Sequence, residues 1–189
     1  MSLRYLFLSS ILAMSLPNTA YAASAYTKWV FRHQVDAMTD EVLEMAVLSY
    51  RSDRIAFACW PKNPEYGVAV TFSPEIYISS LKKREYAYFV WVEAQVRFDD
   101  SPAARSLFKP EGENLRLLDY LTDPAEEFGG LEDTAHLMSF IDQIETAKVL
   151  RIRIQQRDGT PVNWWFDLAD SHAALTRLRT LCPTSWSVK

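Results

Sequence analysis

The amino-acid sequence predicts a mainly β, α+β fold: an antiparallel β-sandwich with one or two flanking α-helices. In most segments apolar residues alternate with polar ones, which is typical of strands that bury one face. Asp158-Gly159 separates two such segments, as in a β-hairpin. Two further segments, both in the last third of the chain, place apolar residues three and four positions apart, the period of a packed helix.

The N-terminus has the pattern of a secretory signal peptide. Arg4 gives a positive start, residues 5–16 are mainly apolar, and Ala20-Tyr21-Ala22 has the small-residue form that signal peptidase cleaves, with Ala23-Ser24-Ala25 as a second candidate. The apolar run is shorter than the ~20 residues that span a bilayer. We therefore expect residues 1–22 to be cleaved, and residues 23–189 to form one β-rich periplasmic domain without a membrane span.

Composition excludes one class of partner. Hydrophobic residues make up 49% of the chain, which is ample for a core. Loss of Arg4 with the signal peptide leaves 20 − 1 = 19 Lys and Arg against 24 Asp and Glu, a net charge near −5. A nucleic-acid partner would require a basic surface, so none is expected.

Before residue 99, strands are expected at residues 29–35, 55–59, 68–72, 76–78 and 86–98. His33 falls on the apolar side of the first strand and is expected to be half-buried. Residues 39–50 fit a helix nearly as well as a strand, and periodicity leaves both open. Residues 99–130 are rich in Pro and acidic residues and are expected to form loops, with one short turn near residues 115–121.

The clearest hairpin lies near the C-terminus. Residues 150–155 alternate between aliphatic and polar side chains, and residues 162–166 return as the partner strand. Asp158-Gly159 between them favours a tight type I′ turn, in which both central residues have positive φ.

The two helices are expected at residues 133–147 and 170–182. Their apolar stripes are Leu137, Phe140, Ile141 and Ile144 in the first and Leu175, Leu178 and Cys182 in the second. Asp133 or Thr134 is expected to cap the first helix, and Asp170 or Ser171 the second.

Cys59 and Cys182 are expected to form a disulfide, because export places an even number of cysteines in an oxidising compartment. Each cysteine lies on the apolar side of its predicted element, so the strand and the helix are expected to pack together. A bridge across residues 59–182 stabilises by about 4 to 5 kcal/mol in the chain-entropy model.

No catalytic or phosphate-binding motif is present, and the chain holds only five glycines. The three histidines, His33, His136 and His172, have no metal-ligand spacing. We therefore expect a non-enzyme with no cofactor and no metal. Acidic residues between positions 119 and 133 could bind calcium through carboxylate oxygens, but they lack the spacing of a calcium loop, and a solvated acidic loop is the favoured interpretation.

Two alternative functions remain open. Asp99 and Asp100 could serve as the paired carboxylates of a small secreted hydrolase; a charged strand terminus is the favoured interpretation. An inhibitor or immunity-type protein would instead present an exposed loop at residues 101–114, with Leu107-Phe108 protruding.

Residues for partner binding are expected on the outward side of the strands. Arg97, Arg151, Arg153 and Arg157 are candidates for a basic stripe, with a solvated sheet face as the default. Trp164 and Trp165 are adjacent in one strand, so one points to the core while the other covers the C-terminal helix or lies on the surface. We place Trp164 with the arginines as a candidate.

The order of these features resembles the VasI/TagO-like periplasmic proteins associated with type VI secretion. The points of resemblance are the signal peptide, Trp29, residues 36–41 (DAMTDE), Cys59, residues 96–103 (VRFDDSPA), Phe140-Ile141, residues 149–153 (VLRIR), residues 166–168 (FDL) and Cys182. The chain departs from the family at residues 155–159 (QQRDG) and at Ala169. The resemblance implies a non-catalytic accessory or binding protein with a protein partner in the cell envelope, and carries over no catalytic residue.

Overall fold

The computed structural model describes residues 28–86, 89–117 and 134–186. The predicted signal peptide, the cap residue Asp133 and the acidic residues of positions 119–133 lie outside these ranges.

The described residues form one ten-stranded antiparallel sheet and two α-helices. The strands are β1 (Lys28–Val35), β2 (Val42–Tyr50), β3 (Asp53–Cys59), β4 (Val68–Ser73), β5 (Lys83–Tyr86), β6 (Phe89–Phe98), β7 (Ala104–Glu111), β8 (Asn114–Leu117), β9 (Val149–Gln155) and β10 (Pro161–Asp167); the helices are α1 (Thr134–Thr146) and α2 (Ser171–Leu181). The strand order is β1-β2-β3-β4-β8-β7-β6-β9-β10, and β5 also pairs with β6. The predicted mainly β class with flanking helices is confirmed.

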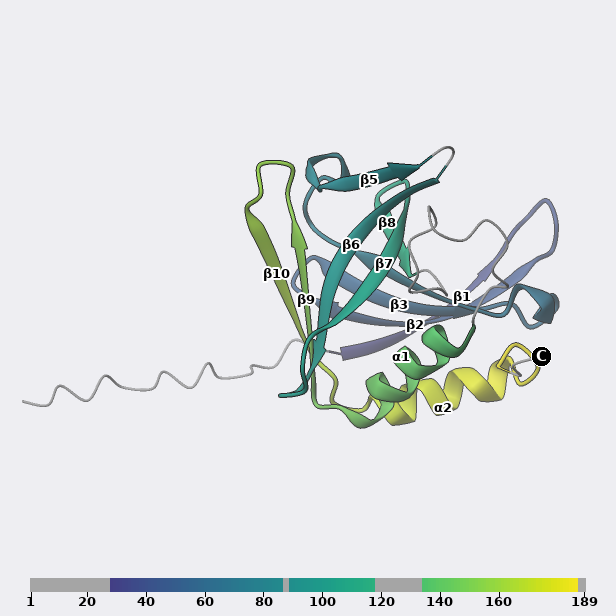
Figure 1. Ribbon diagram of the computed structural model, residues 1–189. Coiled ribbons are helices and arrows are strands. Elements are labelled where there is room, and N and C mark those ends of the chain that lie inside the picture. Colours follow the sequence, from purple (N-terminus) through teal and green to yellow (C-terminus); the bar gives the residue numbers. More distant parts are fainter. Residues whose placement is uncertain (1–27, 87–88, 118–133, 187–189) are drawn as a thin grey trace, which may run out of the picture.

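The sheet curls around its own core, so that strands distant in the sheet order face each other. In Figure 1, β6, β9 and β10 rise steeply from β1–β3, and α1 and α2 lie side by side at the lower end. The ring of Phe72 in β4 lies 5.0 Å from that of Trp164 and 5.9 Å from that of Phe166, both in β10. The sheet thus packs face to face with itself, as the layers of a sandwich do.

Residues 39–50 fit both the helix and the strand period, and the structure shows a strand, β2, over Val42–Tyr50. β2 pairs along its length with β1 and with β3, so its backbone groups are satisfied by two neighbours that periodicity cannot reveal. The turn before it is closed by Asp36, whose Oδ1 accepts from the amides of Met38 (2.8 Å) and Thr39 (3.0 Å). His33, near this end of β1, is not half-buried as expected: 59% of its side chain is exposed, and Nδ1 lies 2.6 Å from Glu44 Oε1.

The prediction of loops at residues 99–130 is wrong for residues 104–117, where β7 and β8 form a hairpin. Glu111 pairs with Asn114, leaving the two-residue turn Gly112-Glu113, with φ of 62° at the glycine. Positive φ at the first central position is the requirement of a type II′ turn, and it needs glycine. Pro110 within the strand hid the pattern, because proline is rare in strands.

Two further boundaries differ from expectation. Residues 76–78 are not a strand; a short 3-10 helix covers Ile78–Ser80, and another covers Pro64–Tyr66. The long strand predicted at residues 86–98 is two elements, since β5 ends at Tyr86 and β6 begins at Phe89.

The β9–β10 hairpin is present, but its turn is not type I′. Gly159 has a φ of 87°, whereas Asp158 is not among the residues with positive φ. The Gly159 amide donates to the Gln156 carbonyl at 3.0 Å, and the Gln156 amide donates to the Thr160 carbonyl at 2.9 Å. This is a three-residue loop that ends in a left-handed glycine. Compared with the predicted two-residue turn, this loop shifts the pairing of β9 with β10 by one residue.

Both helices pack as predicted, and the disulfide joins the second to the sheet. The apolar stripes of α1 and α2 are buried. Asp170 occupies the N-cap of α2, but its side chain makes no capping hydrogen bond. Cys182 follows α2 directly and is bonded to Cys59 at the end of β3, with 6.2 Å between the Cα atoms. The predicted pairing is confirmed; such bridges are typical of extracellular and periplasmic proteins.

Candidate functional site

Arginine side chains gather on the outer face of β6 and β9. Arg97 in β6 lies opposite Arg151 in β9, and Arg151 lies opposite Trp165 in β10. Two residues further along β9, Arg153 lies between Gln95 of β6 and Asn163 of β10. Since directly opposed residues share one face of a sheet, these side chains form one continuous surface. We call Arg97, Arg151, Arg153 and Trp165 the arginine face.

Arg97 and Arg151 share one carboxylate. Asp100 Oδ1 lies 3.6 Å from a guanidinium nitrogen of Arg97 and 3.8 Å from one of Arg151, while 96% of the Asp100 side chain is exposed. Arg151 Nη1 also donates to the backbone carbonyl of Asp99. The two guanidinium groups are therefore held in place by a single counter-ion that remains open to solvent.

The surface tryptophan of β10 is Trp165, not Trp164 as predicted. Trp164 is only 5% exposed and packs against Phe72, whereas Trp165 is 55% exposed. Trp165 does not cover the C-terminal helix; the guanidinium of Arg151 lies 5.0 Å from its ring centroid, in cation–π geometry. A two-residue turn at Asp158-Gly159 would have paired Trp164 with Arg153 and placed it outside. The three-residue loop reverses the two faces of β10.

Arg153 and Arg157, the other predicted members of the stripe, lie differently. Arg153 Nε donates to Asn163 Oδ1 at 2.7 Å, which fixes the plane of its guanidinium group. Arg157 is exposed in the hairpin turn beyond the end of β9, and its backbone amide donates to the Ser80 carbonyl at 2.9 Å. The structure thus brings Arg97, Arg151 and Arg153 together on one face and leaves Arg157 outside it.

The Asp99–Asp100 pair provides no support for the hydrolase alternative. Asp99 Oδ1 accepts from the backbone amides of Lys148 and Val149, each at 2.9 Å, so this carboxylate holds the turn before β9. Asp100 is open to solvent and ion-paired. Neither residue lines the two pockets described below.

The feature expected of an inhibitor-type protein is also not seen. Leu107 and Phe108 do not protrude from a loop; both lie in β7 with no exposed surface. In the part of the chain that the structure describes, no group of three or more His, Cys, Asp or Glu side chains is arranged to hold a metal ion.

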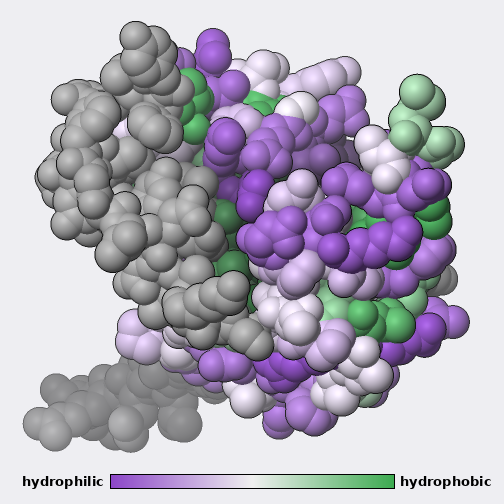
Figure 2. Space-filling model, turned by 90° about the vertical axis from the view of Figure 1, so that its right-hand side faces the viewer, coloured by the Kyte–Doolittle hydropathy of each residue, from purple (hydrophilic) through white to green (hydrophobic). Residues whose placement is uncertain are grey.

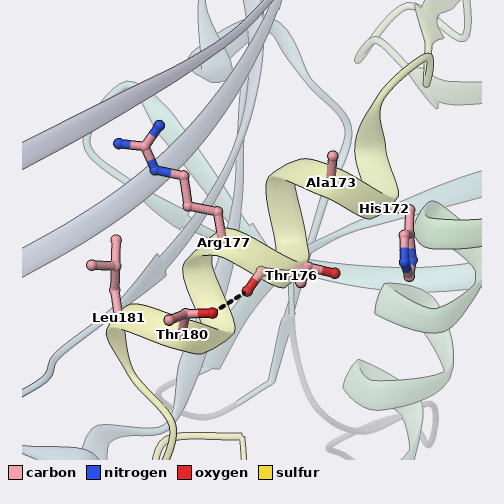
Figure 3. A pocket seen from close by; sticks show the side chains of 6 residues that line it. All are labelled: His172, Ala173, Thr176, Arg177, Thr180 and Leu181. Atoms are coloured by element: carbon pink, nitrogen blue, oxygen red, sulfur yellow. Dashed lines mark hydrogen bonds between the residues drawn. The ribbon is translucent and has the colours of Figure 1, made fainter.

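A shallow pocket of about 480 Å³ follows the solvent side of α2 (Figure 3). Its polar groups are engaged locally: the Thr180 hydroxyl donates to the Thr176 carbonyl at 3.0 Å, and the Arg177 guanidinium lies 4.1 Å from the Phe31 ring centroid. His172 at its other end is exposed. The contacts of Thr180 and Arg177 leave this pocket with few polar groups available to a ligand.

A second pocket adjoins the arginine face where β5 meets β9. Lys82 and Arg84 contribute to it together with Arg153. Sequence reasoning missed Lys82 and Arg84 because their segment has no alternating pattern. The run Lys82-Lys83-Arg84 was the available signal.

Other parts of the surface are less distinctive. Figure 2 shows the end of the molecule that carries the β1–β2 turn and the C-terminal end of α2; it is mainly hydrophilic, with small separate hydrophobic patches on the described residues.

Among the helices of the described residues, none is both long and apolar enough to cross a bilayer.

Comparison of the chain with protein-family models, with curated proteins and with solved structures finds no match.

Proposed function

We propose that this chain is an exported, non-catalytic binding domain that holds an acidic protein partner in the cell envelope through its arginine face. The observation that carries the proposal is the row of Arg97, Arg151 and Trp165 on an open sheet face, in a chain whose net charge is −4. A local excess of arginine on an acidic protein selects for a partner of opposite charge.

The chemistry of the row suits protein recognition. Guanidinium groups bind carboxylates through paired hydrogen bonds, and Trp and Arg are the residues most enriched at the energetic centres of interfaces. Asp100 occupies the position that a partner's carboxylate would take, and its exposure makes it easy to displace.

Export and pathway have separate support. The N-terminal pattern and the Cys59–Cys182 bridge support export to the periplasm. The resemblance to VasI/TagO-like proteins supports an accessory role beside a type VI-like secretion system. Mass spectrometry of the exported protein tests the first point: its N-terminus is expected at Ala23, and an uncleaved chain would contradict it.

The partner is tested by co-purification from a periplasmic extract under oxidising conditions, with proteins identified by mass spectrometry. The variant Arg97→Gln/Arg151→Gln is compared with Arg32→Gln/Arg54→Gln, which removes the same charge from exposed positions on β1 and β3. We expect an acidic envelope protein to be retained by the wild type and by the control pair, to be lost from the first variant, and to dissociate as salt is raised. Equal recovery with both variants would overturn the proposal.

A further inference from the structure

The second pocket lies where β6 changes its partner strand. β5 pairs with β6 as far as Val92, and β9 begins to pair with β6 at Ala94, so Glu93 lies between the two ladders. Beyond this point the Lys82 amide donates to the Gln155 carbonyl at 2.8 Å, which joins the two strand ends. The pocket has a volume of about 460 Å³. This size is within the range of small-molecule sites. In Figure 1 the start of β5 and the turn of the β9–β10 hairpin meet at the upper end of the molecule.

Two cations in this pocket, Lys82 and Arg153, have no acidic partner within the described ranges of the chain. Among the described residues, no carboxylate lies within 4.0 Å of the Lys82 ammonium or of the Arg153 guanidinium. Because Arg153 Nε is held by Asn163, its two Nη groups are oriented in advance and remain available to a ligand. A fixed guanidinium group loses less freedom when it binds, which favours affinity.

Glu93, the one carboxylate that the described residues contribute to the pocket, is already neutralised. Glu93 Oε2 lies 3.3 Å from Arg84 Nη2 and 3.4 Å from Arg105 Nη2. The charges that line the pocket are Lys82, Arg84 and Arg153 against Glu93, which gives 3 − 1 = +2. Gln95 and Gln155, both exposed, add uncharged amide donors beside the cations.

We propose that this pocket binds the dianionic phosphate group of a small phosphate monoester. Two net positive charges match a dianion, the Arg153 fork matches two phosphate oxygens, and Lys82 supplies a point charge to the third. A carboxylate carries one charge and would leave one cation unmatched. The site shares Arg153 with the arginine face but contains none of Arg97, Arg151 and Trp165, so phosphate binding can be tested without the proposed protein partner.

The test uses the exported, oxidised protein, titrated with inorganic phosphate and with glycerol 2-phosphate at constant ionic strength in chloride, and followed by backbone-amide NMR. We expect saturable shifts centred on Lys82, Gln95 and Arg153. Binding should weaken below about pH 6, where a phosphate monoester loses its second charge. Acetate at equal concentration should bind more weakly.

Substitutions locate the binding to the pocket. Arg153→Gln is expected to weaken phosphate binding by about tenfold or more, because a charge-assisted hydrogen bond is lost. Lys82→Gln is a second variant, in case the first perturbs the hairpin. Arg157→Gln, in the turn outside the pocket, removes the same charge and should leave the affinity unchanged. Non-saturable shifts, acetate binding equal to phosphate, or equal loss in the Arg157 control would each overturn the proposal.

Discussion

Arg97 and Arg151 lie directly opposite each other on β6 and β9, with the carboxylate of Asp100 within 3.6 Å of the first and 3.8 Å of the second. Like charges in directly opposed positions of a sheet repel, so Asp100 is the counter-ion that lets the pair persist. Because almost all of its side chain is exposed, solvent screens this interaction strongly. Asp100 therefore offsets the repulsion between the two arginines, but it can be displaced by the carboxylate of a partner.

Asp100→Asn should separate stability from binding. We expect the free energy of unfolding to fall by less than about 1 kcal/mol, because exposed ion pairs contribute little. Affinity for an acidic partner should rise at low salt, since an internal competitor is removed. Urea unfolding and partner titration measure the two effects. Asp142→Asn, which alters an exposed ion pair of α1 with Arg179, serves as the control; equal partner affinity in both variants would contradict the prediction.

The Cys59–Cys182 bridge is expected to be structural. It spans a sequence separation of 123 residues, so its loss should lower stability by about 4 to 5 kcal/mol in the chain-entropy model, with strain reducing that figure. Cys59→Ser/Cys182→Ser and the reduced wild type should both melt at lower temperature than the oxidised protein, and partner contacts should persist at temperatures where the variant is folded. An unchanged melting temperature under reductant would show that the bridge does not stabilise the fold.

The two adjacent tryptophans of β10 provide a matched pair. Trp164→Ala should lower the free energy of unfolding by about 3 to 5 kcal/mol, because it leaves a cavity against Phe72. Trp165→Ala should leave stability nearly unchanged and weaken partner binding, since the ring is exposed and lies against Arg151. Thermal unfolding and partner titration distinguish these results. Similar stability losses in both variants would mean that the register of the hairpin is different.

Acidification should change the contribution of three carboxylates to the free energy of unfolding, in a direction set by the pKa shift of each. Backbone amides of Met38 and Thr39 lower the pKa of Asp36 below its ordinary 3.8, and the Thr160 amide does the same for the pKa of Asp158. A lowered carboxyl pKa gives stability that is present above pH 3.8 and is lost as pH falls through the folded-state pKa. Burial raises the pKa of Asp53, against opposing hydrogen bonds from Glu75 and Trp164, so its effect has the opposite sign.

Urea unfolding between about pH 2.5 and 6 measures how the free energy of unfolding depends on these three carboxylates. The stability deficit of Asp36→Asn/Asp158→Asn relative to the wild type should be largest above pH 3.8 and shrink on acidification. Asp53→Asn should show the reverse slope, because charging a partly buried carboxylate disfavours the folded state as pH rises. A deficit that does not vary with pH in either variant would contradict the assignment.

Several features of the fold followed from local pattern. The apolar stripe of α1 and the alternation of β9 predicted buried faces that the structure confirms. The remaining features depended on neighbours distant in sequence. β2 fits both periods and becomes a strand because β1 and β3 pair with its two edges. β7 contains Pro110, and its pairing with β8 and β6 overrides that local signal.

By itself, the sequence determined the class of the fold, the pairing of its two cysteines and the outward placement of Arg97, Arg151 and Arg153, because periodicity and an even cysteine count are local or compositional properties. Only the tertiary structure decided which tryptophan joins these arginines and that a pocket forms beside them. The first depends on a one-residue difference in loop length, which exchanges the two faces of β10. The second depends on β5 and β9 sharing one edge of β6, an arrangement set by strand pairing between distant segments.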